Sequence, residues 1–88
     1  MKVVIKAGEM PKVGDIKACK ASTGERVSIY RVTADTLQIQ ARRGKEQPIV
    51  GTCHYPAKSM YGDPRDLCQA EIYIEHGVPH CILRPLPR

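Results

Sequence analysis

Apolar and polar residues alternate in two neighbouring segments, 26–32 and 37–43, which are joined by the polar stretch 33–36. Alternation with a period of two is typical of a strand that buries one face, and two such strands separated by a short linker predict a β-hairpin. This hairpin is the clearest structural signal in the chain.

The register of the hairpin decides which side chains face the core. Placing Val32 opposite Leu37 puts Tyr30 on the core face, because side chains alternate between the two faces of a strand. Val27 and Ile29 then lie on the other, mixed face together with polar residues.

Shorter segments of the same kind predict three further strands at residues 2–6, 16–21 and 49–54, each bounded by glycine or proline turns. Residues 55–62 have no clear period. We expect them to form a long loop, a kind of segment that often carries function.

The segment that follows starts with a helix signal, because Asp63 suits an N-cap and Pro64 suits the first helical position. One continuation is a helix over residues 64–76. The other is a short helical turn followed by a strand over 70–76, paired with residues 80–84. Strict alternation of apolar and polar residues over 70–75 favours the strand.

In this second hairpin, a loop over residues 76–79 places Ile74 opposite Cys81. Glu71 then meets Arg84 on the other face, and this match of opposite charges supports the register.

Together these segments predict one mainly β domain over residues 1–84: an antiparallel sheet or small barrel of five or six strands with one short helix, with a β-rich α+β fold as the alternative. Residues 85–88 are expected to form an extended tail, because two of the four are prolines that cannot continue a strand ladder. Composition agrees, since Val and Ile number 15 against four Leu.

The core of such a domain is thin. The chain has 88 residues and contains no Phe or Trp, so its four Tyr are the only large aromatic side chains. Small domains bury a smaller share of their surface than large ones. Formation of a homodimer would add burial.

Positive charge is concentrated in the first half of the chain. Residues 1–44 hold nine basic and four acidic residues, whereas residues 45–88 hold five of each. A basic face attracts polyanions such as nucleic acid, although a net charge of +5 also suits an ordinary solvated surface. The candidate nucleic-acid-binding residues are the cations and amides of the predicted strands and turns: Lys17, Lys20, Arg31, Gln38, Gln40, Arg42, Arg43 and Lys45.

With Tyr30 facing the core, no cluster of aromatic rings lies between these cations, so contact with the nucleic-acid backbone is favoured over base stacking. A protein-binding module or small inhibitor protein is the alternative function. It would present an edge strand, the 55–62 loop, or the mixed hairpin face that carries Val27 and Ile29.

Catalytic and metal chemistry find little support. Six potential metal ligands lie in the second half of the chain, but none forms a Cys-x-x-Cys pair or a helical His pair: Cys53, His54, Cys68, His76, His80 and Cys81. Cys53 and His54 are adjacent, and adjacent strand residues point to opposite faces. No phosphate-binding glycine motif is present. We therefore predict a non-enzymatic protein without a cofactor or metal.

The apolar run at residues 1–6 is too short for a signal peptide or a membrane-spanning helix. We therefore expect a cytoplasmic protein without a membrane partner. In that compartment the four cysteines, Cys19, Cys53, Cys68 and Cys81, are expected to be reduced thiols rather than disulfides.

Overall fold

The computed structural model describes residues 1–6 and 8–86, and within them the alternating segments form seven β-strands in two antiparallel sheets. One sheet has the order β1-β6-β7 and the other the order β2-β3-β4-β5. The strands are β1 (Lys2–Ile5), β2 (Ile16–Lys20), β3 (Arg26–Thr33), β4 (Thr36–Arg42), β5 (Ile49–His54), β6 (Cys68–Glu75) and β7 (Val78–Pro85). The prediction of a mainly β fold is confirmed.

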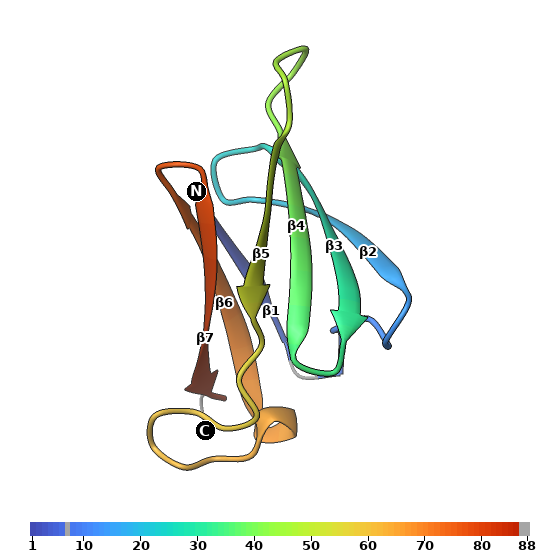
Figure 1. The fold of residues 1–88 in the computed structure, drawn as a ribbon. Coiled ribbons are helices and arrows are strands. Elements are labelled where there is room, and N and C mark those ends of the chain that lie inside the picture. The colour runs from blue at the N-terminus through green and yellow to red at the C-terminus, as the bar shows by residue number, and fades with distance from the viewer. Residues whose placement is uncertain (7, 87–88) are drawn as a thin grey trace.

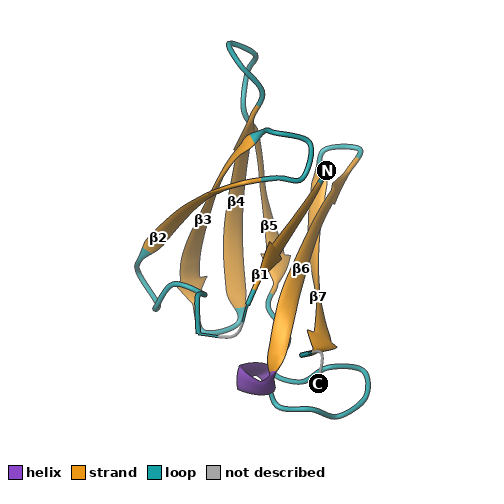
Figure 2. Ribbon diagram, turned by 180° about the vertical axis from the view of Figure 1, so that it is seen from behind, coloured by secondary structure: helices purple, strands orange, loops and turns teal. Residues whose placement is uncertain are grey.

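The two sheets pack face to face, with β5 and β7 on neighbouring edges (Figures 1 and 2). Each strand of a half-buried sheet turns every second side chain inward, so the core consists of two interleaved sets of apolar residues. The four-stranded sheet contributes Val27, Ile29, Leu37, Ile39 and Ala41, and the three-stranded sheet contributes Val3, Ile5, Ala70, Ile72, Ile74 and Leu83.

The hairpin of β3 and β4 forms, but the expected register is wrong by one residue. Ile29 lies opposite Ile39, and Tyr30 lies opposite Gln38. The connecting turn is two residues long, and the pairing is irregular between Arg31 and Thr33, which is typical of a β-bulge. A shift of one residue exchanges the two faces of a strand.

The exchange reverses the roles of three side chains. Val27 and Ile29 are 1% and 0% exposed, and Tyr30 is half-buried on the outer face. The hairpin surface proposed for a protein partner is therefore the core of the domain.

A strand follows the predicted helical turn, as the alternating pattern favoured. The turn is a single 3₁₀ element, η1 (Arg65–Leu67), and β6 begins directly after it. The prediction of Asp63 as N-cap is wrong, because Pro64 occupies that position without a side-chain cap.

The hairpin of β6 and β7 is tighter than expected. Its loop is His76-Gly77, with φ of 53° and 77°, in place of the predicted four-residue loop. Positive φ at both central residues is characteristic of the type I′ turn, whose twist matches that of the paired strands. Ile72 therefore lies opposite Cys81, a shift of two residues that leaves every side chain on its expected face.

β7 extends to Pro85, one residue beyond the predicted end of the domain, and Pro87 and Arg88 of the expected tail lie outside the described residues. Within the described part of the chain, no helix has the length and apolar character needed to cross a membrane.

Candidate nucleic-acid interface

Three cations form a row across the outer face of the four-stranded sheet. Lys20 of β2 lies opposite Arg26 of β3, and Arg26 lies opposite Arg42 of β4. All three side chains are exposed. Their neighbours along each strand point inward, because Val27 and Ala41 belong to the core.

The next two rows of the same face carry hydrogen-bonding groups and one aromatic ring. Ser28 lies opposite Gln40, and Tyr30 lies opposite Gln38. Apolar side chains flank these rows on the outer strands, where Ile16 and Val50 are exposed. The face thus combines a positive end, amide groups and a ring.

The row of cations is not neutralised by the described part of the protein. None of its members forms an ion pair or a side-chain hydrogen bond with another described residue. Like charges placed directly opposite each other destabilise a sheet. This arrangement therefore opposes folding slightly and attracts anions.

On the outer face of the three-stranded sheet, cations are paired with a carboxylate. Glu71 is buried on its outer face, where Arg84 Nε lies 2.8 Å from one carboxylate oxygen and Lys2 Nζ lies 3.4 Å from the other. The hydroxyl of Tyr73 also donates to Glu71, at 2.5 Å. Burial alone would raise the pKa of Glu71, but these hydrogen bonds lower it overall.

Four of the eight sequence-predicted residues share the outer face of the four-stranded sheet: Lys20, Gln38, Gln40 and Arg42. Sequence reasoning missed Arg26 and Tyr30. The signal that would have found them is the exact pairing of β3 with β4, since the alternation within β3 was visible and only its assignment to the two faces was wrong.

The four other predicted residues are cations that lie elsewhere, and three of them are near the same sheet. Lys17 is half-buried on the inner side of β2, opposite Ile29, and Lys45 is in the turn that joins β4 to β5. Arg43 binds the buried carboxylate of Glu25, with Nη2 2.7 Å from Oε1. Hydrogen bonds from Thr23 and then from Arg43 lower the pKa of Glu25, so Arg43 already has a carboxylate partner.

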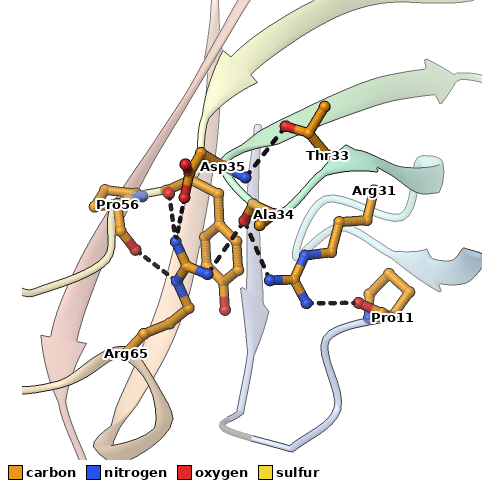
Figure 3. A network of polar contacts seen from close by, with 8 residues as sticks. Pro11, Arg31, Thr33, Ala34, Asp35, Pro56 and Arg65 are labelled. Atoms are coloured by element: carbon orange, nitrogen blue, oxygen red, sulfur yellow. Dashed lines mark hydrogen bonds and ion pairs between the residues drawn. The ribbon is translucent and has the colours of Figure 1, made fainter. Parts of the chain in front are cut away.

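Arg31 belongs to a network at the far end of the sheet (Figure 3). It donates to the carbonyl oxygens of Pro11 at 3.2 Å and Ala34 at 3.1 Å, and Arg65 donates to the same Ala34 oxygen at 3.1 Å. The two guanidinium carbons lie 5.2 and 4.0 Å from the centre of the Tyr55 ring.

Arg65 is the centre of this network. Its guanidinium also donates to the carbonyls of Pro56 and Tyr55 and to the carboxylate of Asp35. These contacts fasten the start of the 55–62 loop to the β3–β4 turn. Both arginines are thus held by carbonyl groups, a stabilising role rather than a free binding surface.

The thiols are placed for packing. Cys53, Cys68 and Cys81 are buried, and Cys19 is half-buried. Burial raises the pKa of Cys53 to about 11 and that of Cys81 to about 12, which suppresses the reactive thiolate. Among residues 1–6 and 8–86, no three Cys, His, Asp or Glu side chains come together as a metal site.

The fold and this outer face define a small two-sheet β domain with an unneutralised row of cations on one sheet. Comparisons of the chain with protein families, with curated proteins and with solved structures find no match. The function is therefore inferred from the residues of this face.

Proposed function

We propose that the protein binds single-stranded nucleic acid on the outer face of the four-stranded sheet. The observation that carries the proposal is the cross-strand row of Lys20, Arg26 and Arg42, three exposed cations without a carboxylate partner among the described residues. Phosphates of one strand would lie along this row, since Lys and Arg contacts to phosphate supply most of non-specific affinity.

Tyr30, Gln38 and Gln40 extend the interface beyond the phosphates. A ring on a sheet surface can stack against a base, and side-chain amides can hydrogen-bond to base edges. Bases are available for such contacts when they are unpaired, so a single strand suits this face better than a duplex. One ring and three cations imply modest affinity, on the order of 10⁻⁴ to 10⁻⁶ M at moderate salt.

The salt dependence of binding tests the row directly. The probe is a fluorescein-labelled single-stranded DNA 15-mer of mixed sequence, followed by anisotropy over a series of salt concentrations. Each phosphate contact to a single strand contributes about 0.7 to the slope of log K against log salt. The triple variant Lys20→Ala, Arg26→Ala, Arg42→Ala should flatten the slope by about 2.

The matched control removes the same charge elsewhere. Lys6, Lys12 and Lys58 are exposed and lie outside the four-stranded sheet, so changing all three to Ala should leave most of the slope intact. If the two triple variants had equal effects, binding would depend on the net charge of the protein and not on the position of these cations. Absence of binding by the wild type at low salt would refute the proposal.

A single substitution separates binding from folding. Arg26 is the middle of the row, and Thr fits a strand well while removing the repulsion from both neighbours. Arg26→Thr should therefore leave the free energy of unfolding unchanged or raise it by a few tenths of a kcal/mol, while weakening nucleic-acid binding. Loss of stability together with binding would mean that the row supports the fold.

A further inference from the structure

The outer edge of β7 contains a short stretch of backbone that has no partner strand. The two-residue turn makes Glu75 and Val78 a hydrogen-bonded pair, so even-numbered residues of β7 direct their backbone groups to β6. The hydrogen bonds of Ile74 N–H to Met1 and of Leu86 N–H to Leu67 agree with this phase. Odd-numbered residues of β7 therefore direct theirs away from the sheet.

Prolines close this edge at both ends. Pro79 and Pro85 occupy two of the outward positions and have no N–H, which is a common way to protect an edge strand. Between them, Cys81 and Leu83, which are 8% and 5% exposed, each direct one N–H and one carbonyl away from β6. No backbone hydrogen bond of these two groups is found with the described residues outside the β6–β7 ladder.

A groove of about 250 Å³ lies beside this unpaired stretch. Its walls are four consecutive residues of β7 and part of the 55–62 loop: Cys81, Ile82, Leu83 and Arg84 on one side, and Pro56, Lys58, Met60 and Tyr61 on the other. Consecutive strand residues point to opposite faces, so a groove that touches four in a row follows the strand's edge.

The groove is lined by exposed apolar side chains and by one cation from each side. Met60 and Tyr61 are 85% and 69% exposed, although both are large side chains that gain by burial. Lys58 is exposed, and Arg84 is half-exposed while its Nε forms an ion pair with Glu71. The residues that line the groove include two cations and no carboxylate.

We propose that this groove binds an extended acidic peptide segment of another protein, which adds a strand to the edge of β7. Its backbone pairs with Cys81 and Leu83, its apolar side chains pack against Met60 and Tyr61, and its carboxylates lie near Lys58 and Arg84. Addition of a strand to a free sheet edge is a recurrent mode of peptide recognition. The distance between the two prolines limits the paired segment to about five residues.

Charge favours such a peptide over the other possible occupants. A second copy of the chain that paired antiparallel through the same edge would place Pro79 opposite Pro85, and its own groove would add two further cations and no carboxylate. A nucleic-acid strand has no regular array of backbone N–H and carbonyl groups to continue the sheet. The groove is also a separate site from the row of cations, which lies on the other sheet.

The test uses the full chain and a synthetic probe, acetyl-Glu-Val-Leu-Val-Glu-amide. Titration of the ¹⁵N-labelled protein should give saturable shifts at the amides of Cys81 and Leu83, and slower hydrogen exchange at both. A peptide methylated at the two amide nitrogens that face β7 keeps its charge and side chains but loses those donors. It should bind at least about tenfold more weakly, as should the peptide with Lys in place of both Glu.

Two exposed protein variants complete the test. Lys58→Glu should weaken binding of the acidic peptide and improve binding of the lysine peptide, and Tyr61→Ser should weaken both. The proposal fails if the N-methylated peptide binds as well as the parent, or if the shifts fall on the four-stranded sheet. It also fails if the Cys81 and Leu83 amides exchange slowly in the free protein, since the edge would then already be paired.

Discussion

Gly51 lies at a close contact between the edges of the two sheets. It lies in β5, and a Cβ atom built at this position would be 2.6 Å from Cδ and 3.0 Å from Cγ of Pro79 in β7. Real Cβ atoms essentially never come within 3.0 Å of such a neighbour, so the 2.6 Å contact with Cδ requires a shift. The ring of Pro79 is stiff and its residue is buried, so neither neighbour can move aside cheaply.

Replacing Gly51 with Ala should therefore push β5 and β7 apart. Adding a methylene to a well-packed site costs about 1 to 3 kcal/mol. Part of this loss is offset, because glycine loses about 0.5 to 1 kcal/mol more in backbone entropy on folding than alanine does. The net loss should be about 1 to 2 kcal/mol, and each kcal/mol lowers Tm by about 4 to 8 °C in a domain of this size.

A double-mutant cycle identifies the cause. Pro79→Ala removes both ring atoms that the new methyl group would meet, at the expense of some apolar burial. Urea unfolding of the wild type, the two single variants and the double variant gives the coupling energy between the sites. Gly51→Ala should destabilise the wild type clearly and the Pro79→Ala background little. A destabilisation of the same size in both backgrounds would refute the steric explanation.

Three further outcomes test other parts of the fold. The pKa of Glu71 is lower in the folded than in the unfolded protein, so its carboxylate stabilises the fold above the unfolded pKa of about 4.3. This stabilisation is lost as the pH falls through the folded pKa. Between pH 5 and pH 2, the urea midpoint should therefore fall further for the wild type than for Glu71→Gln. Arg65→Lys should lower the free energy of unfolding by about 2 to 3 kcal/mol in urea titrations, because lysine cannot reproduce four directed guanidinium hydrogen bonds. In native protein at pH 8, iodoacetamide should modify Cys19 first, and mass spectrometry should find Cys53 and Cys81 modified only as the protein unfolds.

The sequence was sufficient to locate the strands, most clearly where apolar and polar residues alternate as a half-buried sheet requires. The choice between helix and strand after η1 illustrates this. Local signals at Pro64 favoured a helix start, but the alternation of Ala70, Ile72 and Ile74 has no helical period. Burial of these three side chains between the sheets outweighs the local preference, and the helix is limited to one turn.

The register of the hairpins could not be predicted from the alternation of residues, because it depends on the length of the turn and on bulges beside it. In the β3–β4 hairpin, a two-residue turn combined with a bulge near Val32 gives a pairing that differs by one residue from that of a four-residue loop. Nothing in the polar stretch 33–36 distinguishes these two solutions. The His76-Gly77 turn is similar, since His at a positive φ is a weaker signal than the Asn-Gly pair that usually marks such turns.

The candidate interface depended on register and on long-range partners, so it could be predicted only in part. Lys20 and Arg42 are exposed in either register, whereas Tyr30 changes face with a shift of one residue. Arg31 and Arg43 look like free cations in the sequence. Their partners, the carbonyl of Pro11 and the carboxylate of Glu25, are 20 and 18 residues away and meet them only in the folded chain.

The two outer faces differ in whether their cations have carboxylate partners within the fold. On the three-stranded sheet, two cations and a hydroxyl surround Glu71, so charge there is balanced within the fold. Near the row on the other sheet, the buried carboxylate of Glu25 is bound by Arg43 and Thr23. Arg26, directly after Glu25, is therefore left with Lys20 and Arg42 as its neighbours. A carboxylate at either flanking position would stabilise the sheet by cross-strand pairing, and its absence from all three positions of the row favours an external anion as the partner.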